Sequence, residues 1–484
     1  MSDPGAAAGP GSAAGAGAAA TRTEHDSLGE VRVPIDAPWG AQTQRALDNF
    51  DVGGQRFPID VIHQIATIKA AAAFVNGTRD DVATMDREMA SAVERAALAV
   101  AAGTHDDAFP LDVLQTGSGT SSNMNVNEVV ARLASIEVGR AVHPNDHVNA
   151  SQSSNDVVPT AIRLAVRVAL GEVDAALEHL SSVLDAKGAE FADVVKMGRT
   201  HLMDAAPVLL GWEFDGWAAQ LRNAAARIAD AAPSLSAVPL GGTAVGTGVN
   251  VPPGWVDAVL NRLGELSGTA VGPTPHAYVS QAGHEDLVAA GGALKAGATA
   301  LIKVASDLRL MASGPFGGLG EIVLPAIQPG SSIMPGKVNP VICESVVQAG
   351  YRVIGNDVTL GVAAASGTLE LNTTMPLMAW VLLESAGLVR RSARALADRC
   401  VAGIVADEQR CAELAGRSPA LVTGLVPFIG YEVAARAARL VGEHGVPLAD
   451  ALARLGVDLD ADPRLREAID PARLARPAHP ARGG

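Results

Sequence analysis

The feature that most constrains the fold is a stripe of apolar residues that recurs at alternating steps of three and four between positions 162 and 184. These steps place the side chains on one face of a long helix. The stripe consists of Ile162, Val166, Leu170, Val173, Leu177, Leu180 and Leu184. A second stripe consists of Leu287, Leu294, Leu301, Val304, Leu308 and Met311, and helical patterns also cover 206–232, 341–364 and 376–400. Several such helices predict a bundle, because each buries its apolar face against another helix.

Composition favours the same fold class. Aromatic residues make up only 3% of the 484 residues, whereas alanine and aliphatic residues are abundant, which favours interdigitated helices over a β-sandwich. The length exceeds what one hydrophobic core usually supports. We therefore expect a mainly α protein with an elongated central helical bundle and smaller N- and C-terminal domains. The expected divisions are a tail at 1–22, an N-terminal domain at 23–150, the bundle at 151–410 and a small helical domain at 411–484.

The two ends of the chain differ from the bundle in composition. Residues 1–22 are almost entirely Ala, Gly, Ser and Pro, which cannot bury enough surface to offset the entropy of ordering, so a disordered tail is expected. Residues 23–150 mix short apolar runs with turns and one longer helical pattern, from Asp81 to Ala102.

Charge and cysteine content exclude several classes of protein. A net charge of −15 without a basic cluster argues against a nucleic-acid partner. The three cysteines, Cys343, Cys400 and Cys411, are too scattered for a disulfide framework or a zinc motif, so no metal is predicted and a reducing cytoplasm fits. No apolar run approaches the about 18 residues of a membrane span, and no signal peptide is evident. Near-heptad stripes on long helices also predict a homo-oligomer.

One segment of the bundle region is rich in hydrogen-bond donors and in helix-breaking residues. It runs from Gly330 to Pro340 and is interrupted by Pro335-Gly336, so neither helix nor strand can pass through it. Such a loop suits a small anion. It is not a phosphate-binding P-loop, because five residues separate its glycines where four are needed and Val338 follows Lys337 where a hydroxyl is needed.

Three further segments are unusually polar for this chain: 116–125, 143–156 and 198–207. The first is either an exposed turn that ends in a helix cap or an anion site. The second predicts a capping loop with Asn155 or Asp156 as the N-cap of the long helix, whose free N–H groups could also hold a carboxylate. The third contains His201, a titratable group that Glu344 could orient.

Together these segments resemble the fumarase/aspartase superfamily. The match runs in order from Glu24-His25-Asp26-Ser27 and Trp39-Gly40-Ala41-Gln42-Thr43-Gln44-Arg45 almost to the C-terminus. Its main motifs are Gly117-Ser118-Gly119-Thr120 with Asn123-Met124-Asn125, Ser151-Gln152-Ser153-Ser154-Asn155-Asp156, Gly198-Arg199-Thr200-His201, and Gly330-Ser331-Ser332-Ile333-Met334-Pro335-Gly336-Lys337-Val338-Asn339-Pro340. Within the superfamily the chain is most similar to the class II fumarases, metal-independent hydro-lyases of the tricarboxylic acid cycle that interconvert fumarate and L-malate.

The resemblance implies a homotetramer without a cofactor, with each active site built from three subunits. It implies that Ser331 removes a proton from C3 of malate and that His201, paired with Glu344, handles water. It also implies two groups of binding residues. The substrate carboxylates would be held by Ser118, Gly119, Thr120, Ser153, Ser154, Asn155, Thr200, Ser332, Lys337 and Asn339. A secondary anion site would comprise Arg140, His143, Asn145 and Asp146.

Physical chemistry constrains these roles. Removing a proton next to a carboxylate creates an aci-carboxylate with additional negative charge, which Lys337 and Asn339 would stabilise. Ser331 could act as a base only if loop N–H groups and positive charge favour its alkoxide. Two alternatives remain open at this point: an aspartate ammonia-lyase or related lyase acting on a succinyl skeleton, and a catalytically silent structural protein.

Overall fold

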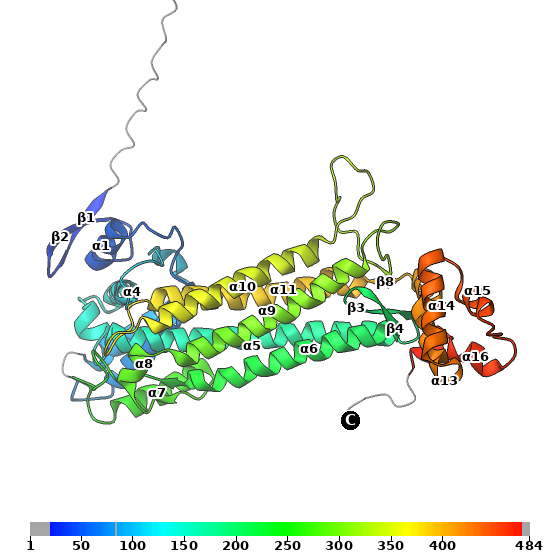
Figure 1. The fold of residues 1–484 in the computed structure, drawn as a ribbon. Helices are drawn as coiled ribbons and strands as arrows, with labels where there is room; N and C mark the ends of the chain where they lie inside the picture. The colour runs from blue at the N-terminus through cyan, green and yellow to red at the C-terminus, as the bar shows by residue number, and fades with distance from the viewer. Residues whose placement is uncertain (1–19, 83–84, 477–484) are drawn as a thin grey trace, which may run out of the picture. The chain divides into compact units, whose positions relative to one another are not determined.

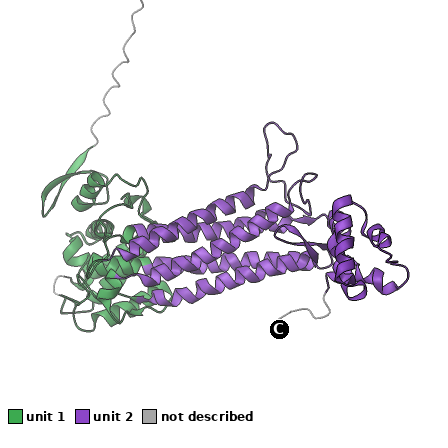
Figure 2. Cartoon of the chain, in the orientation of Figure 1, with its two compact units in different colours: residues 1–162, 238–282, 368–376 green, residues 163–237, 283–367, 377–484 purple. Residues whose placement is uncertain are grey.

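The computed structural model describes residues 20–82 and 85–476. The chain divides into two compact units (Figure 2). The first unit takes the chain up to residue 162 together with 238–282 and 368–376, and the second takes 163–237, 283–367 and the chain from 377 onward. The domain limits expected from the sequence do not coincide with these units and stay a prediction.

The protein is mainly α-helical, as predicted, and its longest helices lie where the sequence shows the two apolar stripes and the further helical patterns (Figure 1). They are α5 (Ser154–Glu190), α6 (Leu210–Ala231), α9 (Glu285–Met311), α10 (Val341–Ala365) and α11 (Met375–Arg399). Every member of the first stripe is at most 1% exposed. Since burying one such aliphatic side chain contributes about 1.5–3 kcal/mol, the stripes account for much of the bundle's stability.

Helix α9 is the one described helix that is long and apolar enough to cross a membrane by length and composition. In this structure 56% of its apolar window is buried. All members of the second stripe are buried. The hydrophobicity of α9 is therefore accounted for by packing inside the second unit.

The first unit consists of short helices and a β-hairpin. Its hairpin pairs β1 with β2 in antiparallel register. The elements are β1 (Thr21–Asp26), β2 (Gly29–Pro34), α1 (Ala41–Asn49), α2 (Ile59–Asn76), α3 (Arg87–Ala101), α4 (Thr120–Val138), α7 (Trp255–Ser267) and α8 (Ala277–Ala282), together with the first residues of α5.

Two expectations for this region are wrong. Thr21 and Arg22, assigned to the tail, lie in β1, where the Arg22 guanidinium donates to four carbonyl oxygens, including that of Trp39 at 2.5 Å. The rest of the tail, up to residue 19, lies outside the described residues. The helix expected from Asp81 begins at Arg87, because the Asp86 carboxylate accepts a hydrogen bond from Met89 N and caps it.

Helix α2 is not predicted by the sequence pattern. It is buried on almost all sides, so its apolar residues show no helical period. Its single lysine, Lys69, has no exposed surface.

The second unit adds two small sheets and the C-terminal helices to the bundle. Strands β3 (Val195–Thr200) and β4 (Met203–Leu209) form an antiparallel hairpin, and β7 (Ile322–Val323) pairs with β8 (Val405–Ala406). The C-terminal helices have a core of their own that includes Leu425 and Leu452. They are α12 (Glu408–Arg417), α13 (Val426–Ile429), α14 (Tyr431–His444), α15 (Leu448–Arg454), α16 (Pro463–Ala468) and α17 (Pro471–Leu474).

Candidate active site

Three hydroxyls from two helix starts meet in the first unit. Thr120 is the first residue of α4 and Ser154 is the first residue of α5. Thr120 Oγ1 lies 2.8 Å from Ser118 Oγ and 2.8 Å from Ser154 Oγ. Two helix N-termini, each with free N–H groups and the positive end of a helix dipole, therefore converge on a chain of hydroxyls, an arrangement that suits a carboxylate.

The turn before α4 is held by close backbone packing. Gly117 O accepts a hydrogen bond from Met375 N at 3.0 Å. A Cβ at Gly117 would lie 1.8 Å from Thr373 O, so only glycine fits there. Gly119 then takes a left-handed conformation and occupies the N-cap position of α4. The polar run at 116–125 is thus a turn followed by the first turns of a helix, and the expected helix cap lies at Gly119, not at the end of the run.

The N-cap of α5 lies two or three residues earlier than expected. Ser153 O accepts from Val157 N at 3.0 Å, which makes Ser153 the N-cap, so the prediction of Asn155 or Asp156 is wrong. Ser153 Oγ accepts from Asn155 N at 3.2 Å, and Asp156 Oδ1 accepts from Ser153 N at 2.9 Å. These reciprocal bonds hold the candidate ligands Ser153, Ser154 and Asn155 on the first turn of α5.

A polar cavity of about 540 Å³ lies beside this loop in the first unit. Ser153 lines it, as do Asn145 and Asp146 of the predicted secondary anion site. Arg140, the only cation expected in that secondary site, instead forms ion pairs with Asp86 and, at 3.6 Å, with Glu88.

His143, the remaining member of that site, is part of a tight local turn. Its Nδ1 accepts hydrogen bonds from Asn145 N at 3.3 Å and Asp146 N at 3.1 Å. His143 N in turn donates to His147 Nδ1 at 2.7 Å. Burial lowers the pKa of His147. Three of the four predicted residues are thus adjacent, and Arg140 is held by other carboxylates.

In the second unit, Thr200 and His201 lie at the tip of the β3–β4 hairpin. Thr200 pairs with Met203, so His201 and Leu202 form a two-residue turn. Both have positive φ, 55° and 61°, a conformation that hairpin turns usually assign to Asn-Gly. A non-glycine residue there costs on the order of 1–3 kcal/mol and indicates functional sites more often than ordinary turns. His201 is exposed at this strained tip.

A buried ion cluster anchors the same hairpin. Glu321 has no exposed surface and accepts from Arg199 Nη1 at 2.9 Å and 3.1 Å with its two oxygens. Lys196 Nζ lies 3.4 Å from Glu321 and 2.9 Å from Glu213. Arg199 immediately precedes Thr200 and His201, so this cluster determines where the tip of the hairpin lies.

The loop from Gly330 to Pro340 is held by three hydrogen bonds, two that join its ends at Gly330 and one within its central turn. Gly330 N donates to Lys337 O at 2.9 Å, Lys337 N donates to Met334 O at 3.3 Å, and Asn339 Nδ2 donates to Gly330 O at 2.6 Å. A Cβ at Gly330 would lie 2.3 Å from Lys337 O, which makes glycine necessary. Ser331 and Lys337 line a cavity of about 480 Å³ in this loop, and Ser332 and Lys337 are exposed.

Backbone amides within this loop are directed at the Ser331 hydroxyl. Ser331 Oγ accepts from Ile333 N at 3.2 Å and from Met334 N at 3.0 Å. The same contacts occur in ordinary serine turns. They also supply two donors that favour negative charge on this oxygen.

Helix α10 begins directly after the loop and carries Glu344 on its first turn. Within one chain, no hydrogen bond or ion pair between the described side chains of His201 and Glu344 is formed. The adjacent Cys343 is buried, with its sulfur 3.7 Å from that of Cys400, and all three cysteines are free thiols. Burial raises the pKa of Cys411 to about 12.

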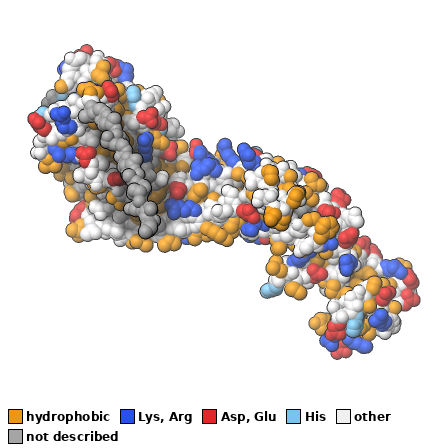
Figure 3. All heavy atoms as spheres, turned by 90° about the horizontal axis from the view of Figure 1, so that it is seen from above, with side chains coloured by type: hydrophobic (Ala, Val, Ile, Leu, Met, Phe, Trp, Pro, Cys, Tyr) orange, Lys and Arg blue, Asp and Glu red, His pale blue; other side chains and the backbone are white. Residues whose placement is uncertain are grey.

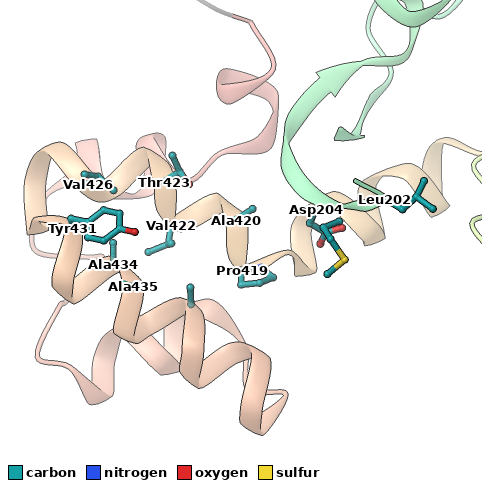
Figure 4. A pocket seen from close by; sticks show the side chains of 12 residues that line it. Leu202, Asp204, Pro419, Ala420, Val422, Thr423, Val426, Tyr431, Ala434 and Ala435 are labelled. Atoms are coloured by element: carbon teal, nitrogen blue, oxygen red, sulfur yellow. The ribbon is translucent and has the colours of Figure 1, made fainter. Parts of the chain in front are cut away.

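An apolar groove of about 680 Å³ lies beside the hairpin tip in the second unit (Figure 4). Leu202 and Asp204 come from the hairpin, whereas Val422, Tyr431 and Ala434 come from the C-terminal helices. Leu202 and Tyr431 are 73% and 77% exposed.

Among residues 20–82 and 85–476, no group of three or more His, Cys, Asp or Glu side chains is arranged to hold a metal ion. The buried charged groups that were not predicted from the sequence include Lys69 beneath the 149–152 turn and Glu321 beneath the hairpin. A single lysine within the apolar run from Ile65 to Val75 was the available signal for the first. Nothing local identified the second, because its partners Lys196 and Arg199 are far away in the sequence.

Comparison with known proteins places the chain in a family. The model of a family described as lyase matches residues 29–355. Class II fumarate hydratase from Xylella fastidiosa is 50% identical over 87% of this chain and 89% of its own length. Class II fumarate hydratase 1 from Pseudomonas aeruginosa is 47% identical over 95% of this chain and 99% of its own length. Among solved structures, class II fumarase from Schistosoma mansoni is 37% identical with a TM-score of 0.91, covering 95% of this chain and all of the other.

The fold and the donor-rich loops are thus those of a lyase built on long helices. The chain belongs to the lyase family and, within it, to the class II fumarate hydratases.

Proposed function

We propose that this protein catalyses the reversible, stereospecific hydration of fumarate to L-malate. The observation that carries the proposal is the identity of about half of all positions with class II fumarate hydratases over nearly the whole chain. The polar segments that this chemistry requires are all present, which argues against a silent scaffold.

The first unit supplies binding groups for one substrate carboxylate. In the proposal, Ser118, Thr120 and Ser154 donate hydroxyl hydrogen bonds at the paired starts of α4 and α5, while Ser153 and Asn155 complete the set. The converging helix ends favour a negative charge at this point although the chain as a whole is acidic.

Ser331 is proposed as the base in the dehydration direction. Its alkoxide takes the proton from C3 of malate, and the electron pair of that C–H bond moves into the neighbouring carboxylate to form the aci-carboxylate. The two loop amides that donate to Ser331 Oγ support this role, because they lower the energy of the alkoxide.

Lys337 and Asn339 would stabilise the charge that this step creates. Their positions in the same closed loop as Ser331 support the assignment. The aci-carboxylate then re-forms the carboxylate and expels hydroxide from C2, and His201 supplies the proton that turns hydroxide into water. Glu344 would stabilise the protonated form of His201, which regains a proton from solvent as Ser331 releases its own to solvent, and Thr200 would be a further substrate ligand. Every step is assigned to a side chain of the protein, so the proposal calls for no cofactor.

We also propose that the site is completed by other copies of the chain in a homotetramer. Within one chain His201 and Glu344 do not contact each other, so their pairing would require a second copy. The exposed face of α10 supports association, because Tyr351, Val358 and Val362 are 62%, 64% and 70% exposed. In the space-filling view, hydrophobic side chains lie exposed among charged ones on the face shown (Figure 3). A neighbouring helical copy would bury these side chains.

The same proposal includes a cytoplasmic location and a secondary anion site, which would comprise Arg140, His143, Asn145 and Asp146. The adjacency of His143, Asn145 and Asp146 supports the secondary anion site. The free cysteine thiols support the cytoplasmic location.

The test follows the ultraviolet absorbance of the conjugated diacid. L-Malate should generate absorbance and added fumarate should lose it, whereas L-aspartate should give no absorbance and no ammonia. Activity on L-aspartate alone would replace the proposal by an ammonia-lyase, and inactivity on both substrates would favour a silent scaffold.

A further inference from the structure

Lys69 is the feature of the first unit that the proposed chemistry does not explain. It lies in the middle of α2 between residues that are themselves fully buried, such as Ile68 and Ala70, and it has no exposed surface. Burying an ammonium group costs several kcal/mol unless charges and hydrogen bonds compensate. An apolar side chain would pack at this position without that cost, so the lysine needs a reason beyond packing.

Its contacts are directed at one turn, residues 149–152. Lys69 Nζ donates to Asn149 Oδ1 at 2.7 Å and to Gln152 Oε1 at 3.0 Å. Asn149 Oδ1 also accepts from Asn123 Nδ2 at 3.3 Å and from Asn127 Nδ2 at 3.2 Å, both on α4. Three donors from two helices therefore converge on a single amide oxygen of the turn.

The turn is held by hydrogen bonds within it and contains one strained residue. Asn149 Nδ2 donates to Gln152 O at 3.2 Å, and Gln152 Nε2 donates to Val148 O at 3.2 Å and Ala150 O at 3.1 Å. Ser151 has a φ of 62°, which a non-glycine residue adopts only when its surroundings hold it. The Lys69 bonds to Asn149 and Gln152 enclose this residue and hold both ends of the strained segment.

The turn leads directly into the proposed carboxylate ligands. Ser153 follows Gln152, and Ser153 N donates to Asp156 Oδ1 at 2.9 Å. The other oxygen of Asp156 accepts from Gly241 N and Thr243 N, each at 2.9 Å. Burial lowers the pKa of Lys69 to about 7, and the negative charge of Asp156 acts in the opposite direction.

We propose that Lys69 is a positioning residue for substrate binding, whose buried amino group holds the Asn149–Gln152 turn so that Ser153, Ser154 and Asn155 are arranged for a substrate carboxylate. This inference rests on the proposed function. It assigns Lys69 no contact with the substrate, because two amide side chains separate it from the hydroxyls.

The test replaces Lys69 by methionine, which has a similar length but neither charge nor donors. The binding groups act on substrate and transition state alike, so KM for fumarate should rise about tenfold or more with kcat changed by less than about threefold. Hydrogen exchange of the amides at 149–155 should also become faster than in the parent protein. The matched control is Val61→Ala, a fully buried position of the same helix, which should lower the melting temperature without changing KM.

If Lys69→Met does not fold, Gln152→Leu tests the same inference. It removes one of the two acceptors of Lys69 on the turn and should also raise KM. A KM within twofold of the parent, in whichever of the two variants is folded, overturns the inference. Failure of the proposed function differs from failure of this inference, because in the first case the parent protein itself would not hydrate fumarate. Hydrogen exchange of the turn would then test the role of Lys69 without the enzyme assay.

Discussion

Replacing Glu321 by glutamine removes the negative charge from the ion cluster beneath the β3–β4 hairpin and leaves its volume almost unchanged. Glu321 is fully buried, and Arg199 and Lys196 both face it, with side chains that are 13% and 3% exposed. Lys196 retains Glu213 as a partner at 2.9 Å, whereas Arg199 has no other carboxylate among its described ion pairs. Glu321→Gln therefore leaves one buried guanidinium without a counter-charge.

The magnitude follows from this geometry. Breaking a buried ion pair by removing one partner costs about 3–5 kcal/mol. The amide oxygen of glutamine can still accept one bond from Arg199, so a loss near the lower end, about 3 kcal/mol, is expected. For a chain of this size such a loss lowers the melting temperature by about 3 °C. The hairpin tip should loosen as well, which would reduce kcat/KM because Thr200 and His201 follow Arg199 directly.

The assay is thermal unfolding monitored by circular dichroism, together with fumarate hydration below the transition. Glu413→Gln is the matched control, since it makes the same chemical change in the half-exposed pair with Arg410, where an ion pair contributes only about 0–1 kcal/mol. If both variants melted within about 1 °C of each other, the argument that Glu321 anchors the hairpin would be refuted.

Four further outcomes are expected. Ser331→Ala should reduce turnover at least about 1000-fold while leaving the molecular mass by light scattering unchanged, and near-normal turnover would contradict the base assignment. Leu202→Gly should relieve the positive φ at the hairpin tip and raise the melting temperature by about 1–2 °C, whereas a lower value would contradict strain at this residue. Tyr351→Glu should reduce the mass by light scattering and activity together; an intact oligomer would exclude this face of α10 from the interface. Burial lowers the pKa of Lys69 from 10.5 to about 7, so between these pH values the unfolded chain holds the Lys69 proton more tightly than the folded chain. The contribution of Lys69 to the free energy of unfolding therefore rises by about 1.4 kcal/mol per pH unit. The melting temperature of the parent minus that of Lys69→Met should increase from pH 7 to pH 9.

Helices with one buried face were predictable from the sequence, since their apolar residues repeat with the helical period. The stripes of α5 and α9 are examples, and the patterns near 341–364 and 376–400 correspond closely to α10 and α11. Helix α2 was missed for the same physical reason, because a helix buried on all sides has no polar face and thus no period. The limits of α3 and α5 depend on which side chain caps them, Asp86 and Ser153, and several nearby polar residues compete for that role.

In the candidate site, too, some features were predictable from the sequence and others only from the tertiary structure. The types and order of its residues were determined by the sequence: hydroxyls before two helices, a histidine in a short polar segment, and a loop with serine, lysine and asparagine. Such local chemistry depends on neighbours a few positions away. The tertiary structure alone decided that Thr120 meets Ser154 and that Glu321 is buried against Arg199.

Lys69 is the clearest example of a residue whose role could not be predicted from the sequence. In the sequence it is one charged residue within an apolar run, and a solvated face of a helix would have the same composition. Only the packing of α2 and α4 against the turn at Asn149 removes its amino group from water and directs it to two amide oxygens. Its environment depends on contacts about 80 residues apart in the chain, and no local pattern encodes such contacts because they arise only when the helices pack.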